Sequence, residues 1–451
     1  MKILQILPAL QMGGVERGTL EIAHALKHAG IPNAVASQGG PMVETLKAMG
    51  IPHFTLPLMS KNPFTIRRNA VRLAELVQKE GFTLMHARSR APAWSVHWAS
   101  KMCGVPWIAT FHGVYGTKPA FFKIPYNRVM LKGLRTICVS EYVRKHVLET
   151  YHPDPARLVC IPRGADTDFF RPDAVSSEHA LKKKTQQYRF TPDIPVITLP
   201  GRLTFWKGQE VFLESLMQMR HKRVGVLFLG SDQGRTEYSD HLREIAGQLA
   251  DDTEVVFRDH TREIHVVYAL SDIVVNASSA QPEAFGRTIP EAQAMGRIVV
   301  ATAHGGACET IEDGKTGFLV PPGDADALAA KLDEILDMPK EKLDAIRAAA
   351  IESVRANYSI AKMCASTLAL YRELDTAHYS RPPEKISLPR PLAAAAPPSG
   401  APFAAAPPSG APFADALSPP PSHREGRAAA RPPSRTIISP PPNSAPLHCA
   451  P

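Results

Sequence analysis

Short apolar runs alternate with helix-length amphipathic segments through most of this 451-residue chain. The runs are bounded by glycine, proline or polar residues, which is typical of strands buried on both faces of a sheet. Since parallel strands must be joined by crossover helices, the alternation predicts an α/β fold with doubly wound parallel sheets. In the first part the expected strands are residues 2–7, 83–87, 107–111, 136–139 and 157–161, and the expected helices are 15–29, 65–79 and 93–102.

The alternation pauses once, which predicts two α/β halves of similar size. Residues 176–187 are polar and rich in lysine and lie between Pro172 and Pro192, as expected of a connection between domains. Beyond them the expected strands are residues 195–200, 224–229, 253–257, 273–276 and 298–301, and the expected helices are 209–219, 238–250, 290–295 and 324–336. In such sheets a ligand crevice forms at the carboxyl ends of the strands.

These patterns divide the chain into five expected regions. A final helical pattern over residues 342–374 follows the second half and ends near His378. The regions are a Rossmann-like domain at 1–172, a linker at 173–192, a second Rossmann-like domain at 193–358, a helix at 359–380 that returns to the first domain, and a disordered tail at 381–451.

The tail is predicted from its composition. Residues 381–451 hold 20 of the 42 prolines, and residues 395–404 recur unchanged as 405–414. Such a Pro/Ala/Ser/Gly tract buries too little apolar surface to offset the entropy lost on folding. The tail also holds seven basic and three acidic residues, so +4 of the net charge of +9 belongs to it. The body is then only weakly basic and carries no recognised nucleic-acid motif, so we expect no nucleic-acid partner.

Cysteine usage and hydropathy indicate a cytoplasmic protein. No run of about 18 apolar residues is present, which excludes a membrane-spanning helix. The six cysteines show no CxxC spacing, which suits a reducing compartment. The apolar start, residues 3–10, is interrupted by Gln5 and lacks a small-residue cleavage site. It therefore predicts a buried strand rather than a signal peptide.

The most informative motif contains two glutamates, Glu283 and Glu291. Pro290 suits the first turn of a helix, so Glu291 is expected there and Glu283 in the preceding loop. The backbone N–H groups of residues 285–288 would then face the crevice as anion donors. One carboxylate suits a sugar hydroxyl and the other ribose hydroxyls. Two spaced glutamates alone would more simply indicate a solvated helix face.

Two further features suit phosphate. Arg202 and Lys207 follow the strand at 195–200, and a pair of cations at a strand end fits a diphosphate, although two surface cations would look the same. Gly13 and Gly14 join the first strand to the first helix. Their spacing is not that of a dinucleotide fingerprint, but they permit close approach to a phosphate, with a tight turn as the simpler reading.

The ordered set of motifs resembles the retaining GT-B glycosyltransferases of family 4, typified by lipopolysaccharide-core and mannosyl or glucosyl transferases. The resemblance covers residues 2 to about 375 and implies two Rossmann-like domains, for acceptor and nucleotide sugar, facing a central crevice. The motifs are Gly13–Arg17, Thr110–Gly113, Val139–Glu141, Ile161–Asp166, Gly201–Leu203 with Lys207 and Gly208, Glu283 with Glu291, and Gly305 and Gly306 with Glu309 and Gly317.

The resemblance implies roles for individual residues. His112 would lie near the transferred sugar, and Arg17 is a weak acceptor-side candidate. The departures from the family pattern are Arg287 and Thr288 beside the site. The implied donor site consists of Arg202 and Lys207 on the diphosphate, Glu291 on the ribose, Glu283 on the sugar, backbone donors at Phe285 and Gly286, and Gly13 and Gly14 facing the phosphates or the acceptor.

The implied reaction is transfer of a hexosyl group from a nucleotide diphosphate sugar to an acceptor hydroxyl with retention, in lipopolysaccharide or other cell-envelope glycan synthesis. No residue stands out as the nucleophile that double displacement needs, so front-face substitution is expected. No acidic metal-binding cluster stands out, so we expect no essential metal or other cofactor. The alternatives are a GT-B nucleotide-sugar epimerase or hydrolase and a non-catalytic nucleotide-sugar-binding protein.

The expected acceptor is a glycan or glycolipid. A basic and aromatic segment over residues 118–132 and three arginines at 67, 68 and 72 fit an anionic membrane, at the inner face of the plasma membrane. The alternative for both segments is an ordinary solvated basic helix.

Overall fold

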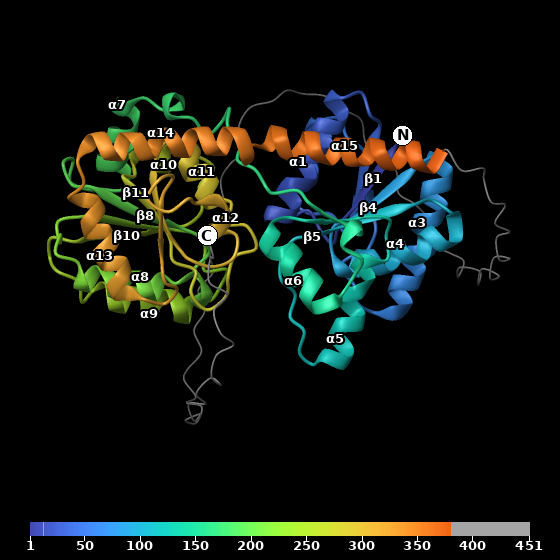
Figure 1. Ribbon diagram of the computed structural model, residues 1–451, viewed down its shortest axis with the longest axis horizontal. Coiled ribbons are helices and arrows are strands. Elements are labelled where there is room, and N and C mark those ends of the chain that lie inside the picture. The colour runs from blue at the N-terminus through green and yellow to red at the C-terminus, as the bar shows by residue number, and fades with distance from the viewer. Residues whose placement is uncertain (12, 380–451) are drawn as a thin grey trace, which may run out of the picture. The chain divides into compact units, whose positions relative to one another are not determined.

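The computed structural model describes residues 1–11 and 13–379 (Figure 1). Two parallel sheets of seven and six strands, each covered by helices, confirm the predicted α/β class and the two Rossmann-like halves. The expected tail lies outside the described residues. No helix in the described part is long and apolar enough to cross a bilayer.

The first half holds the seven-stranded sheet, in the order β3-β2-β1-β4-β5-β6-β7. Its strands are β1 Ile3–Ile6, β2 Asn33–Ser37, β3 His53–Thr55, β4 Leu84–Ala87, β5 Trp107–Phe111, β6 Thr136–Cys138 and β7 Leu158–Cys160. Its helices are α1 Gly14–His28, α2 Val43–Ala48, α3 Pro63–Glu80, α4 Arg90–Cys103, α5 Ala120–Asn127 and α6 Glu141–Tyr151, with short turns η1 Arg128–Leu131, η2 Pro155–Arg157 and η3 Pro172–Ala174. The strand order reverses beside β1, which is where open sheets of this kind bind ligands.

The second half holds the six-stranded sheet, in the order β10-β9-β8-β11-β12-β13. Its strands are β8 Val196–Pro200, β9 Gly225–Leu229, β10 Glu254–Arg258, β11 Ile273–Asn276, β12 Ile298–Thr302 and β13 Phe318–Val320. Its helices are α8 Gln209–Gln218, α9 Thr236–Ala246, α10 Ile264–Leu270, α11 Thr288–Ala294, α12 Ala307–Thr310 and α13 Ala325–Leu336, with the turn η5 Phe205–Lys207. The reversal here lies beside β8, which pairs with both β9 and β11.

The segment predicted as a linker is folded against the second half. It contains α7 Ser177–Lys182 and the π-helical turn η4 Lys183–Gln187. Tyr188 and Phe190 are buried in a cluster with Val196 and Leu227 of the second sheet. The segment was predicted to be a linker because exposed lysines dominate its composition. Tyr188 and Phe190, which follow the lysines, anchor it to the second half.

The helical pattern predicted over 342–374 consists of two helices, α14 Lys340–Asn357 and α15 Ile360–Tyr379. The second of them lies within the region 359–380 that was expected to form a helix of its own. Between them the backbone pairs with Ala165: the Ala165 N–H donates to Tyr358 O, and the Ile360 N–H donates to Ala165 O. This extended pairing interrupts the helix. α14 packs on α11 of the second half, whereas α15 lies along α1 of the first (Figure 1).

The crossing point depends on Gly164. A Cβ at this position would lie 2.3 Å from the carbonyl carbon of Ser359 and 2.4 Å from its oxygen, both rigid backbone atoms. We expect Gly164→Ala to lower the free energy of unfolding by about 1–3 kcal/mol, the usual cost of overpacking. Chemical denaturation measures it. Gly247→Ala is the control, since its Cβ would meet no atom of the described residues closer than 3.4 Å. Equal stability of the two variants would show that the crossing point tolerates a Cβ at Gly164.

Candidate functional site

A cleft of about 710 Å³ lies where loops of the two halves meet. Gly14, His112 and Arg163 line it from the first half, after β1, β5 and β7. Arg202 and residues 281–288 line it from the second half, after β8 and β11. All these loops follow the carboxyl ends of parallel strands, which is where ligands bind in such sheets.

Glu283 lies in the loop predicted for it and is tightly held. One carboxylate oxygen accepts hydrogen bonds from Lys207 Nζ at 2.5 Å, Asn276 Nδ2 at 2.9 Å and Ser278 Oγ at 3.1 Å. Burial opposes ionisation of this carboxyl, but the Lys207 ammonium and these donors hold its pKa below the usual range. Glu283 is therefore an oriented carboxylate.

The backbone after Glu283 offers unused donors. Gly286 has φ of +76°, a left-handed conformation that favours glycine. The N–H groups of Phe285, Gly286 and Arg287 donate to no atom among residues 1–11 and 13–379. The loop packs closely against Gly305 and Gly306. A Cβ at Gly306 would lie only 2.5 Å from Phe285 Cα. This contact gives the two glycines a role that the sequence alone did not reveal.

Arg202 is exposed and lines the same cleft. Its backbone oxygen accepts a hydrogen bond from Gln209 Nε2 at 2.9 Å, which fixes the loop. Within the described residues no carboxylate lies at ion-pair distance from its guanidinium. Lys207 does not line the cleft; it bonds Glu283, and its ammonium lies 4.6 Å from the centre of the Trp206 ring. Thus one cation is free for an anion and the other orients a carboxylate.

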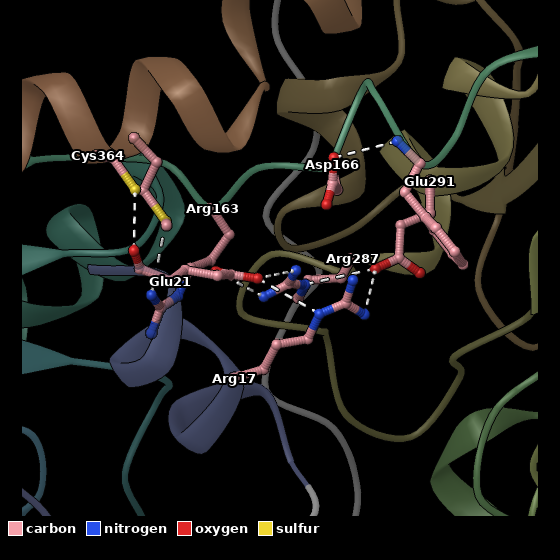
Figure 2. A network of polar contacts seen from close by, with 9 residues as sticks. Arg17, Glu21, Arg163, Asp166, Arg287, Glu291 and Cys364 are labelled. Atoms are coloured by element: carbon pink, nitrogen blue, oxygen red, sulfur yellow. Dashed lines mark hydrogen bonds and ion pairs between the residues drawn. The ribbon is translucent and has the colours of Figure 1, made fainter. Parts of the chain in front are cut away.

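Glu291 lies in the first turn of α11, where it was predicted, inside a ring of four charges (Figure 2). Arg17 Nη1 lies 3.3 Å from Glu291 Oε1, and Arg287 Nε lies 3.5 Å from the same oxygen. Glu21 closes the ring, 2.7 Å from Arg287 Nη2 and 3.4 Å from Arg17 Nε. We call these four residues the charge ring.

The charge ring joins the two halves. Arg17 and Glu21 belong to α1, and Arg287 and Glu291 belong to the start of α11. The Glu291 side chain is only 7% exposed, and burial raises its pKa while the two guanidiniums oppose the rise. Arg17, predicted for the acceptor, therefore contacts the carboxylate predicted for the ribose, and neither side chain is among the cleft-lining residues.

His112 and Arg163 form the opposite wall. Arg163 Nη2 contacts His112 Nδ1. Because a guanidinium only donates, Nδ1 must accept and the imidazole is neutral, with its proton on Nε2. Burial and the charges of Arg163 and Arg88 lower the pKa of His112 well below its usual range. The sequence patterns predicted no role for Arg163, although it lies within the motif Ile161–Asp166.

Gly13 and Gly14 begin α1. A Cβ at Gly13 would lie 2.5 Å from Glu16 Oε2, so this carboxylate folds back to the start of the helix. No atom of residues 1–11 and 13–379, apart from the neighbouring backbone, lies within 4 Å of a Cβ at Gly14, which lines the cleft, whereas Gly13 does not.

Further hydrogen bonds cross between the halves. Glu309 accepts hydrogen bonds from the backbone N–H groups of Glu141 at 2.8 Å and Tyr142 at 2.6 Å, at the start of α6. Ser140 Oγ donates to Ala284 O at 2.5 Å, beside Glu283. In residues 1–11 and 13–379, no three His, Cys, Asp or Glu side chains are grouped so as to hold a metal ion. Whether activity needs a metal stays a prediction.

Both halves of the chain match known protein families. The family model "Glycosyltransferase Family 4" matches residues 12–169, and "Glycosyl transferases group 1" matches residues 182–352. A glycosyltransferase structure from Rickettsia africae is 37% identical, with 83% of this chain and 98% of that one covered and a TM-score of 0.76. HepE of Anabaena, solved with UDP, is 22% identical, with 83% and 100% covered and a TM-score of 0.73; this likeness shows the fold.

Curated relatives match over shorter regions. D-inositol 3-phosphate glycosyltransferase of Mycobacterium ulcerans is 28% identical over 290 residues, 63% of this chain and 60% of the relative. A GDP-mannose-dependent alpha-(1-6)-phosphatidylinositol monomannoside mannosyltransferase of Mycolicibacterium smegmatis is 32% identical over 209 residues, 45% and 53% of the two chains. The chain thus spans about half to three-fifths of these relatives. With both halves matched and 98% of the Rickettsia structure covered, the chain belongs to the GT-B glycosyltransferases that join a family 4 domain to a group 1 domain.

Proposed function

We propose that the protein transfers a hexosyl group from a nucleotide diphosphate sugar to an acceptor hydroxyl, with retention at the anomeric carbon. The observation that carries the proposal is the juxtaposition, in one cleft, of an unpaired Arg202, the oriented carboxylate of Glu283 and the unused N–H groups of residues 285–287. Cations and amide donors suit a diphosphate, and an oriented carboxylate suits sugar hydroxyls.

The donor would lie along the side of the cleft that the second half of the chain forms. Its diphosphate would contact Arg202 and the amides after Glu283, its sugar would contact Glu283, and its ribose would contact Glu291. HepE, which shares the fold, has been solved with UDP-glucose, and the M. smegmatis relative is named for GDP-mannose. Both names support a nucleotide-sugar donor, and they leave the base to experiment.

Catalysis would rest on stabilising the leaving group. As the glycosidic bond breaks, negative charge grows on the β-phosphate oxygen, where Arg202 and the backbone amides can bind it. In front-face substitution the same oxygen accepts the proton of the acceptor hydroxyl, and the acceptor attacks from the face that the diphosphate leaves. No protein nucleophile and no metal ion is needed for these steps.

The acceptor is proposed to be a cell-envelope glycan or glycolipid, in lipopolysaccharide synthesis or a related pathway, reached from the cytoplasmic face of a membrane. On α5, Phe121 is 85% and Phe122 64% exposed, and Lys118 and Lys123 flank them. Exposed aromatic and basic residues together favour an anionic bilayer surface. The phosphatidylinositol mannosyltransferase relative is named for a lipid acceptor, which agrees with this proposal.

Substitution of Arg202 and Lys207, the residues predicted to bind the diphosphate, tests whether the protein transfers a hexosyl group. We expect Arg202→Ala to lower kcat/KM by about 10²–10³, the usual cost of removing one group that stabilises developing charge. Lys207→Ala should also lower it, because Glu283 loses the ammonium that orients its carboxylate. Nucleoside diphosphate release from UDP-, GDP- and ADP-sugars is the measurement. Arg223→Ala, an exposed cation before β9, is the control. Wild-type turnover in both variants would refute the proposed mechanism.

The ribose contact is tested by a matched pair within the charge ring. One of UDP, GDP and ADP should raise the melting temperature, since ligands stabilise the state they bind. Glu291→Gln should weaken that nucleotide about 10- to 100-fold, because a hydrogen bond to a charged acceptor contributes about 1.5–3 kcal/mol.

Glu21→Gln is the control for this pair. It breaks the same charge ring but contacts no ribose in the proposed complex, so nucleotide affinity should change less than about threefold. Calorimetric titration separates the two variants. Equal losses of affinity would mean that Glu291 acts only through the structure of the charge ring.

The membrane contact is tested with vesicles. The double variant Phe121→Ser/Phe122→Ser should bind anionic phosphatidylglycerol vesicles at least about tenfold more weakly, since it removes apolar area that would enter the bilayer. Sedimentation of vesicles measures this. Leu181→Ser, at an exposed apolar residue of α7, is the control. Unchanged binding by the double variant would exclude α5 as the contact.

A further inference from the structure

The indole ring of Trp206 lies beside the carboxylate that is proposed to bind the donor sugar. Trp206 belongs to the turn η5 and is among the residues that line the cleft. Its backbone oxygen accepts a hydrogen bond from the Ser279 N–H at 3.0 Å, which joins the turn to the loop after β11. Glu283 follows in that same loop, so the backbone holds the ring and the carboxylate together.

Lys207 fixes the ring next to Glu283. Its ammonium lies 4.6 Å from the centre of the Trp206 ring and 2.5 Å from Glu283 Oε1. A cation over the face of an indole is attracted by the negative charge of that face. Trp206 lines the cleft and Lys207 does not, so the ammonium covers the side of the ring that points away from the cleft. The opposite face is left to a ligand.

The Trp206 side chain offers both kinds of surface that a sugar ring requires. It is only partly buried, and its Nε1–H donates to no atom among residues 1–11 and 13–379. A pyranose has a face of C–H groups and carries its hydroxyls at the rim. An indole can cover the C–H face and remove it from water, while its N–H and a neighbouring carboxylate bond the hydroxyls.

We propose that Trp206 binds the hexose of the donor, with its ring against the C–H face of the sugar and Glu283 on the sugar hydroxyls. The inference rests on the proposed function and deepens it, because it assigns recognition of the hexose to a residue other than those for the diphosphate and the ribose. Affinity for a nucleotide hexose then depends on the ring, whereas affinity for the bare nucleoside diphosphate does not.

Calorimetric titration of the full chain compares UDP with UDP-glucose, GDP with GDP-mannose and ADP with ADP-glucose. For the pair that binds, we expect Trp206→Leu to weaken the nucleotide hexose about tenfold, since apolar contact area is lost, and to change the nucleoside diphosphate less than threefold. Phe205→Leu is the matched control and should change neither affinity. Phe205 belongs to the same turn, is 62% exposed and does not line the cleft.

Tryptophan fluorescence separates contact with the sugar from support of Lys207. The nucleotide hexose should change the emission of the wild type, the nucleoside diphosphate should not, and Trp206→Phe should abolish this difference. A ring that only supports Lys207 would give no difference between the two ligands, and that result would overturn the proposal. The fluorescence measurement decides the proposal even if Trp206→Leu does not fold.

The outcomes separate this inference from the proposed function. If the nucleoside diphosphate binds but Trp206→Leu weakens both ligands equally, or neither, the contact with the hexose is refuted and the donor site stands. Lower turnover with unchanged affinity for the nucleotide hexose would assign the ring to the acceptor and likewise refute it. If neither nucleotides nor nucleotide hexoses bind the wild type, the proposed function fails and this inference fails with it.

Discussion

The charge ring is the interaction on which the site depends. Both helices carry an arginine and a glutamate four residues apart, and each guanidinium faces the carboxylate of the other helix. The side chains of Glu21, Arg287 and Glu291 are 10%, 15% and 7% exposed, whereas that of Arg17 is 39% exposed. Removal of one of the three buried partners would therefore leave a largely buried charge uncompensated. The ring therefore fixes the starts of α1 and α11 against each other (Figure 2).

The donor is proposed to use one carboxylate that joins the two halves, Glu291, and one that is held within the second half, Glu283. In the proposed complex a ribose shares Glu291 with Arg17, and a sugar shares Glu283 with Lys207. Ser140 and Glu309 cross between the halves beside the same loops. A donor would thus replace contacts between the protein's own charges, and the loss of those contacts would offset part of its binding energy.

Local sequence patterns predicted the central strands of both sheets and the positions of Glu283 in a loop and Glu291 at the start of a helix. β11 spans Ile273–Asn276 as expected, and Pro290 placed Glu291 in a first turn. β2 escaped prediction because its sequence, NAVAS, carries little apolar signal, and β3 is too short for a pattern. The partners of Glu291 were not predictable, because Arg17 lies 274 residues away and only tertiary packing brings them together. The same holds for Arg163 and His112.

A crystal structure with a bound nucleoside diphosphate tests the central claim most directly. We expect phosphate oxygens within hydrogen-bond distance of the Arg202 guanidinium and of the backbone N–H groups of Gly286 and Arg287, with the ribose hydroxyls on Glu291. A nucleotide bound elsewhere, or one bound in the cleft while Arg17 and Arg287 keep Glu291 from the ribose, would contradict it.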